Sequence, residues 1–273
     1  MKENISNDQV IKEHYRTQAD KHKDSALSTM EDPITRQKEV TLIQNFFRLP
    51  GVQKKCREVL EIGCGNGYTL SHLQPAFPNY TFCGLDFSED LLKIAGSRNL
   101  PGVKFVQGDA RKLPFDKERF DVIYTERCII NLMSWEEQQQ ALNEMHRILK
   151  KGGYILFVES FTEGYLNLNK ARNELGLESI PMPHHNFYFE KELFEPFISR
   201  QFNIVDPADL GAASPYEVAR NFLSTHYFTA RVLHPLLTRG DPFMKNTEFV
   251  KFFSFIPPSG CYAAIEAYIL EKK

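Results

Sequence analysis

Short apolar runs and helix-spaced apolar positions alternate along this chain from residue 58 onward. The apolar runs have the length of buried strands and lie at residues 58–62, 81–86, 103–107, 120–125 and 154–159. Residues 89–97 and 136–150 show helical spacing, and the second stretch ends in the stop signal Lys150-Lys151-Gly152-Gly153. Strands that alternate with helices predict an α/β fold with a doubly wound, mostly parallel sheet.

The N-terminal part has a different pattern. Residues 8–47 are polar with spaced apolar positions, which predicts amphipathic helices interrupted near Asp32-Pro33. We therefore expect residues 1–50 to form a helical cap, or lid, ahead of a core at residues 51–160.

Residues 161–273 are expected to complete the same domain. Two inserts, at residues 161–200 and 212–251, lack a regular pattern apart from a helical centre at 218–237. Strand-like patterns follow the first insert at 202–205 and the second at 261–270. We expect both inserts to lie over the sheet, on the side where a substrate binds.

Composition and charge exclude several classes of protein. The chain carries 33 Lys and Arg against 35 Asp and Glu, without a long basic run, which disfavours a nucleic-acid partner. The five cysteines are odd in number and contain no C-x-x-C pair, so a reducing compartment fits best. Residues 1–20 are polar and no stretch approaches transmembrane length, so we expect a cytoplasmic protein without a membrane partner.

A glycine-rich turn follows the first predicted strand. It reads Glu61-Ile62-Gly63-Cys64-Gly65-Asn66-Gly67. Glycine at such a turn supplies unusual backbone angles and lets a ligand approach the main chain. The G-x-G-x-G spacing differs from the G-x-G-x-x-G fingerprint of dinucleotide sites, so a nicotinamide-dependent oxidoreductase is disfavoured.

Two acids end the next two predicted strands. Asp86 closes the second strand, where a carboxylate can accept hydrogen bonds from both hydroxyls of a ribose. Asp109 closes the third strand, where an acid can accept from an adenine amino group. Each acid alone would more often be a helix N-cap or a solvated strand end, but their order behind the glycine turn favours a nucleoside site.

These motifs, together with Phe120-Asp121-Val122-Ile123, resemble the successive motifs of class I methyltransferases that use S-adenosylmethionine (SAM). The resemblance covers residues 58–160 and implies a Rossmann-like, seven-stranded sheet whose last strand runs antiparallel. It also implies SAM as the cofactor and a small-molecule acceptor as the partner of a monomer or homodimer.

The resemblance implies a role for several residues at the cofactor. Glu61 would support the methionine amino end, and the turn that contains Gly63, Cys64, Gly65 and Gly67 would underlie the cofactor. Asp86 would hold the ribose, while Phe87, Asp109 and Ala110 would surround the adenine. Tyr15, in the N-terminal helix, could fold over the cofactor as such segments do in similar enzymes, although packing of the helix is the commoner role.

The catalytic residues are less defined. Asn131 stands about where similar enzymes carry a histidine, and an amide cannot act as a base. His185 is our first candidate for a base, followed by its neighbour His184, because histidine titrates near neutrality. Glu126, just after the fourth strand, is the rival. Equally, the histidines could only shape an aromatic loop, and Glu126 could form a salt bridge to Arg127 or to another arginine.

The expected activity is methyl transfer from SAM to a small or medium-sized metabolite, with an oxygen of a sugar-like or natural-product acceptor as the first hypothesis. N-methylation and methylation of a peptide carboxylate are alternatives, and so is a SAM-binding partner protein without catalysis. No metal is expected, because Glu126 stands alone after the fourth strand where a magnesium ion would need several carboxylates.

Overall fold

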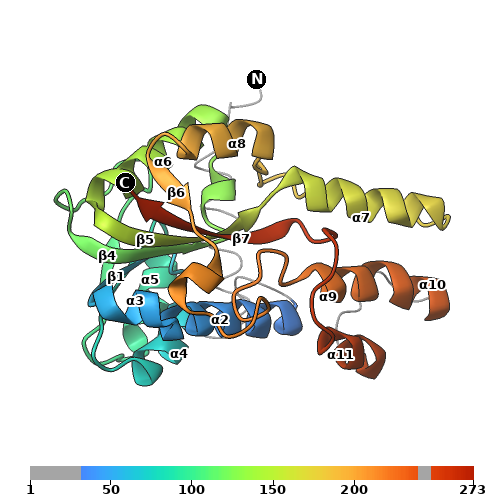
Figure 1. Ribbon diagram of the computed structural model, residues 1–273, viewed down its shortest axis with the longest axis horizontal. Coiled ribbons are helices and arrows are strands. Elements are labelled where there is room, and N and C mark those ends of the chain that lie inside the picture. The colour runs from blue at the N-terminus through green and yellow to red at the C-terminus, as the bar shows by residue number, and fades with distance from the viewer. Residues whose placement is uncertain (1–31, 239–246) are drawn as a thin grey trace.

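The computed structural model describes residues 32–238 and 247–273, which fold around one seven-stranded sheet (Figure 1). The strand order is β3-β2-β1-β4-β5-β7-β6. The strands are β1 (Glu58–Ile62), β2 (Thr81–Asp86), β3 (Lys104–Gln107), β4 (Phe120–Glu126), β5 (Leu149–Ser160), β6 (Phe202–Ile204) and β7 (Ile265–Lys272). Strands β1 to β5 pair in parallel, whereas β7 is antiparallel to both β5 and β6. The expected doubly wound, mostly parallel sheet is confirmed.

Helices cover both faces of the sheet. They are α2 (Pro33–Arg48), α3 (Pro50–Lys55), α4 (Tyr68–Ala76), α5 (Glu89–Ser97), α6 (Trp135–Ile148), α7 (Thr162–Glu174), α8 (Lys191–Ile198), α9 (Ser224–Phe228), α10 (His234–Thr238) and α11 (Glu248–Ser254). Helices α2, α3 and α4 pack on one face, and α6 and α8 on the other (Figure 1). Because both faces are covered, β5 is buried along its last eight residues and reads as a nearly continuous apolar run.

The boundaries at two strands differ from expectation. The helix predicted to reach residue 150 ends at Ile148, because Leu149 already pairs with Phe120 and opens strand β5. The last strand, predicted at 261–270, instead starts at Ile265, opposite Ser160, where β5 ends. In both cases the pairing partner in the sheet sets where the strand begins, and this partner cannot be identified from the local sequence pattern.

The first insert is more regular than predicted. Its two ends form helices α7 and α8, although the pattern of residues 160–200 suggested no regular structure. Helix α7 lies so close to the segment before β7 that a Cβ on Gly164 would collide with the carbonyl of Ala263. Gly164 therefore allows close backbone contact between α7 and the segment that leads into β7.

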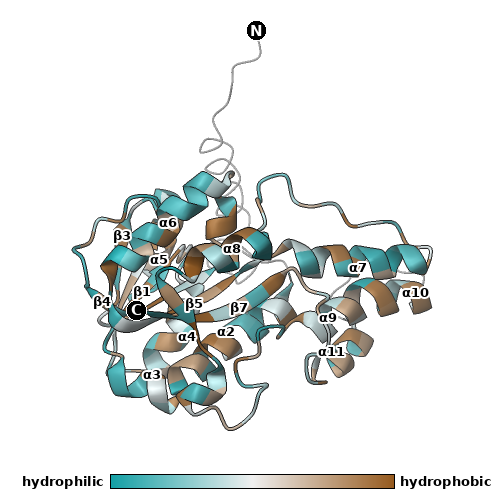
Figure 2. Ribbon diagram, turned by 45° about the horizontal axis from the view of Figure 1, so that its top comes forward, coloured by the Kyte–Doolittle hydropathy of each residue, from teal (hydrophilic) through white to brown (hydrophobic). Residues whose placement is uncertain are grey.

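The second insert contains the predicted helical centre, but only from Ser224 onward. There α9 continues through a π-helical turn, η4 (Thr229–Leu233), into α10. Helix α7 contacts α9 and η4, and these elements extend together away from the sheet (Figures 1 and 2). We call α7, α9, η4, α10 and α11 the helical arm. Within the described ranges, every helix is too short or too polar to cross a bilayer.

Candidate functional site

The glycine turn between β1 and α4 brings the main chain to the surface of a pocket. Gly63, Gly65 and Gly67 adopt φ angles of 80°, 52° and 72°, in the left-handed region that favours glycine. The amide of Gly63 donates to the carbonyl of Leu85 at 2.7 Å, which fixes the turn against β2. A Cβ on Gly63 would overlap the side chain of Cys128, which lies directly against the turn. The turn therefore requires glycine both for its angles and for the space in front of it.

Asp86 is held by the backbone on both sides. Its Oδ2 accepts from the amide of Gly65 at 2.7 Å, and its Oδ1 accepts from the amide of Ser88 at 2.8 Å. Burial raises the pKa of Asp86, while these backbone donors act in the opposite direction. Each oxygen keeps acceptor capacity toward the pocket, which is what two vicinal hydroxyls of a ribose require.

Glu61 is a buried carboxylate that faces the same pocket. Its side chain belongs to a residue only 1% exposed, and Oε2 has no hydrogen-bond partner among the described residues. Burial raises the pKa of Glu61 to about 8, although the charge of Arg36 and the nearby hydroxyl of Tyr124 lower it. A buried carboxylate oxygen without a partner is costly, and a cationic ligand group would satisfy it. The ammonium group of a bound methionine moiety fits this requirement.

Asp109 and Ala110 line the same pocket. The guanidinium of Arg111 donates hydrogen bonds to the Asp109 carboxylate, with Nε at 3.0 Å from both oxygens and Nη2 at 2.7 Å from Oδ2. Burial would raise the pKa of Asp109, but the hydrogen bonds from Arg111 outweigh it and leave this pKa lowered. An adenine amino group would therefore share the carboxylate with Arg111.

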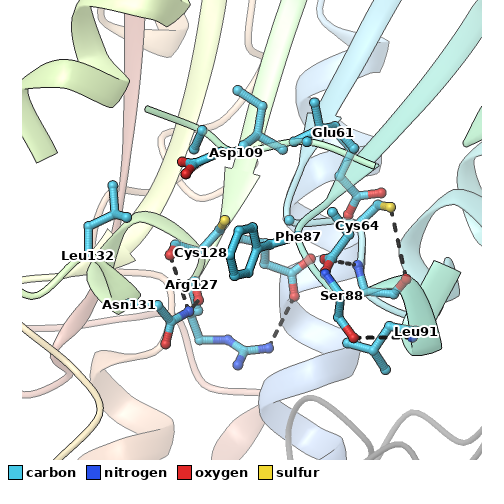
Figure 3. Close-up of a pocket in the computed structure, with 18 of the residues that line it drawn as sticks. Glu61, Cys64, Phe87, Ser88, Leu91, Asp109, Arg127, Cys128, Asn131 and Leu132 are labelled. Atoms are coloured by element: carbon cyan, nitrogen blue, oxygen red, sulfur yellow. Dashed lines mark hydrogen bonds and ion pairs between the residues drawn. The ribbon is translucent and has the colours of Figure 1, made fainter. Parts of the chain in front are cut away.

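The pocket joins these groups into one hollow of about 1020 Å³, counted out to its mouth. Figure 3 shows Glu61 and Cys64 on one side, Asn131 and Leu132 on the other, and the Phe87 ring between them. The residues predicted for the site that line it are Glu61, Gly63, Cys64, Gly65, Asp86, Phe87, Asp109, Ala110 and Glu126. Gly67 lies just behind, as the N-cap of α4, and Tyr15 lies outside the described residues.

Glu126 belongs to a buried network of charges at the rim of the pocket. It forms ion pairs with Arg36 and, at 3.4 Å, with Arg127, and it accepts from the hydroxyl of Thr69 at 3.0 Å. Glu39 balances the charge of Arg127, since Arg127 Nε donates to Glu39 at 2.7 Å. Two arginines thus face two glutamates. To act as a base, Glu126 would have to compete with both guanidinium groups for its own lone pairs.

Sequence reasoning did not identify Arg36, Glu39 or Thr69 as part of the site. Arg36 and Glu39 lie three positions apart on α2, where the helical pattern reads them as part of a solvated face. In the structure both are buried, because α2 packs against the end of β4. The one signal in the sequence was Glu126, for which a salt bridge to Arg127 or to another arginine was an alternative, and the structure shows both pairs.

The two candidate histidines lie outside the pocket lining. His184 is exposed and His185 is half-buried, in a loop at residues 183–189. This loop is bound to the segment that carries Asn131, because the amide of Phe187 donates to the carbonyl of Ile130 at 2.7 Å. Gln138 adds a bond from Nε2 to the carbonyl of Phe187 at 2.8 Å. The role of His185 as a base stays a prediction.

Asn131 lines the pocket from a short 3₁₀ turn, η2 (Ile129–Asn131). A second buried carboxylate, Glu159 at the end of β5, organises this turn. It accepts from the amides of Cys128 and Ile129 at 3.1 Å each, and from that of Ile130 at 3.3 Å. Burial raises the pKa of Glu159 to about 7 against these donors. Sequence reasoning missed Glu159, although an acid at a strand end was the same signal that singled out Asp86.

Comparison with known families and sequences gives a consistent result. Residues 59–153 match a family model described as a methyltransferase domain. The fatty-acid O-methyltransferase of Mycolicibacterium smegmatis is 36% identical over 108 residues, covering 38% of this chain and 37% of that protein. The demethylmenaquinone methyltransferase of Staphylococcus carnosus is 31% identical over 163 residues, covering 58% and 66%. The chain therefore matches between about a third and two thirds of the length of these curated relatives.

Solved structures support the fold. A chain from the complex between the Haloferax volcanii Trm112 methyltransferase activator and a methyltransferase is 16% identical, with a TM-score of 0.58, and the match covers 96% of this chain and 97% of that chain. Haemonchus contortus phosphoethanolamine N-methyltransferase 1, in complex with phosphoethanolamine and S-adenosylhomocysteine, is 19% identical with a TM-score of 0.53, covering 72% and 41%. At these identities the likeness concerns the fold alone.

Proposed function

We propose that this chain, which belongs to the class I SAM-dependent methyltransferases, transfers a methyl group from SAM to an oxygen of a small or medium-sized acceptor. The observation that carries the proposal is a single pocket lined by Glu61, the glycine turn, Asp86 and Asp109, whose groups suit the parts of this cofactor. The unpartnered Oε2 of Glu61 suits an ammonium group, the glycine turn admits close contact, and Asp86 offers acceptors for a ribose.

SAM carries its methyl group on a sulfonium, and the neutral thioether is the leaving group. The chain has mainly to align the acceptor with this methyl group and to exclude water from both. Glu61, Gly63, Gly65 and Asp86 would hold the cofactor. The acceptor oxygen would gain the methyl group while the sulfur keeps the bonding electron pair. An alcohol acceptor would also lose its proton, for which His185 is the candidate base, whereas a carboxylate acceptor needs no base.

The acceptor would enter beside Asn131 and Leu132, between the pocket and the helical arm. Two of the relatives are named for a fatty acid and for demethylmenaquinone, which favours an acceptor with an apolar part. The sequence alone favoured a sugar-like or natural-product acceptor, and that hypothesis stays open. N-methylation and methylation of a peptide carboxylate are alternatives. A SAM-binding partner protein without catalysis would share the cofactor site but would not turn SAM over.

Calorimetric titration of the purified chain with SAM, and separately with NADH, tests the cofactor assignment. We expect SAM to bind and NADH to give no response. Asp86→Ala should weaken SAM binding by at least about tenfold, because the ribose loses charge-assisted hydrogen bonds. Asp90→Ala is the matched control, since Asp90 lies on the exposed side of α5 beside Lys93. Equal SAM affinity in the two variants would contradict the proposed site.

A further inference from the structure

Arg231 in the helical arm has donors that no residue in the described part of the chain accepts. Its guanidinium donates no hydrogen bond to any residue within 32–238 or 247–273, and Nη1 is buried. The side chain is held in place all the same, because its guanidinium stacks on the ring of Tyr227, 3.5 Å from the ring centroid. A buried guanidinium nitrogen without an acceptor costs stability, so a ligand that supplies one would be bound favourably.

Arg231 sits at the centre of the π-helical turn η4, between α9 and α10. A π-helical turn is rare, costs stability and is frequently found at functional sites. Here the turn allows the carbonyl of Arg231 to accept a hydrogen bond from the guanidinium of Arg172 on α7. The two arginines, from different inserts, are thereby fixed next to each other.

The charges around the two arginines do not balance. Arg172 is buried, and burial together with the charge of Arg231 lowers its pKa. Asp32 is the buried acid that acts on Arg231, but its Oδ2 already bonds His226 Nε2 at 2.9 Å and its Oδ1 caps α2. Glu178 is exposed. Two guanidinium groups therefore share one acid that is already bonded elsewhere, in contrast to the balanced network at Glu126.

Neighbouring aromatic residues link the two arginines to residues that line the cofactor pocket. Tyr188 lies close enough to Arg231 and Tyr227 for their charges to act on its hydroxyl, and it packs on Tyr165 with ring centroids 5.8 Å apart. The charges of Glu39 and Arg127 act on the hydroxyl of Tyr227, and Arg127 lines the pocket. The cluster thus lies on the acceptor side of the site.

We propose that Arg231, with Arg172 and Tyr188 beside it, binds the oxyanion group, a carboxylate or a phosphate, of the molecule that this chain methylates. Arg231 would offer a planar pair of donors to two anion oxygens, and Tyr188 one hydroxyl. The anion need not be the methylated atom. The proposal rests on the proposed methyl transfer for the identity of its ligand, while the anion site itself can be measured without turnover.

The test titrates the full chain with sodium phosphate against sodium chloride of equal ionic strength. The readout is the NMR signal of the arginine Nε–H groups. We expect saturable binding of phosphate that shifts the Arg231 signal. Arg231→Gln should weaken this binding at least about tenfold, because hydrogen bonds to charged groups are lost. Arg231→Lys should retain part of it.

Arg220→Gln is the matched control, because Arg220 also stacks on a tyrosine, Tyr268, but pairs with Glu195 at 3.6 Å. It should leave the phosphate affinity unchanged. No saturable phosphate binding, or equal affinity in Arg231→Gln and Arg220→Gln, would overturn the anion site. SAM affinity, measured separately on each variant, should be the same, so failure of the cofactor assignment and failure of the anion site would be told apart.

Discussion

At the residue scale, the acids of the pocket differ in their charge because they differ in their partners. Asp109 is paired with Arg111 and its pKa is lowered. Glu61 lines the same pocket with an oxygen that has no partner, and its pKa is raised to about 8. Without a ligand, Glu61 is therefore mostly protonated at neutral pH, whereas a cationic ligand group would favour its ionised form.

This difference predicts that SAM binding releases a proton from Glu61. Because the pKa is raised without ligand and falls on binding, SAM affinity should rise with pH between about pH 6 and pH 7.5, by up to about tenfold per pH unit. The α-amino group of the ligand has an ordinary pKa of about 7.7–8.0, so it stays mostly charged in this range and its own deprotonation flattens the slope toward pH 7.5. Calorimetry at several pH values measures the slope. Glu61→Gln should bind weakly with a flat profile, while Glu58→Gln, on the same strand, should keep the slope; a flat profile in the wild-type chain contradicts the linkage.

At the scale of the element, η2 depends on a charge supplied by a neighbouring strand. Three successive amides point at Glu159, which lies directly across from Glu266 on β7. Glu266 is neutralised by Lys191 at 2.7 Å. With a pKa of about 7, Glu159 is partly ionised and partly protonated near neutral pH, and protonation removes one of the acceptor positions for these amides.

We expect the backbone amide NMR signals of Cys128, Ile129 and Ile130 to titrate together with a midpoint near the Glu159 pKa of about 7. Glu159→Gln should abolish this titration. The folded pKa is raised from 4.5, so the stability that Glu159 contributes is present below about pH 4.5 and is lost as pH rises through about 7. Glu144→Gln, in which the pKa of the native acid is lowered, serves as control. Unchanged titration in Glu159→Gln would refute this assignment.

At the scale of the whole molecule, the pocket lies at the carboxyl ends of β1, β2 and β4, and the helical arm joins the core through a buried connection. His226 on α9 bonds Asp32 at 2.9 Å and the hydroxyl of Ser254 on α11 at 2.9 Å. Asp32 is also the N-cap of α2, whose Arg36 and Glu39 form the rim of the pocket. The buried side chain of Asp32 thus connects the helical arm, helix α2 and the site.

Asp32→Ala should lower the free energy of unfolding by about 2–4 kcal/mol, the sum of a lost helix cap and an unpaired buried imidazole. Urea denaturation followed by circular dichroism measures the change. Asp206→Ala, which removes the cap of the short 3₁₀ turn at Pro207–Leu210 without touching a histidine, should cost less. Equal losses in the two variants would argue against the connection.

The sequence was most informative where a role depends on neighbours along the chain. The glycine turn, Asp86 and Glu61 belong to one strand–turn–helix unit and the strand beside it, so their order alone located the pocket. Arg36, Glu159 and Arg231 depend on partners brought in from distant elements. Their positions also look like ordinary polar faces in a helical or strand pattern, so only the packing of α2, β7 and the arm reveals their role.

The order of strands in the sheet has a consequence for how this chain emerges from the ribosome. Strand β7 lies between β5 and β6, and Ser160 pairs with Ile265. Until the residues of β7 have been synthesised, β5 has an open edge, and such an edge can pair with another nascent chain. Completion of the sheet therefore has to wait for the synthesis of β7, and until then chaperone binding to β5 would protect the open edge.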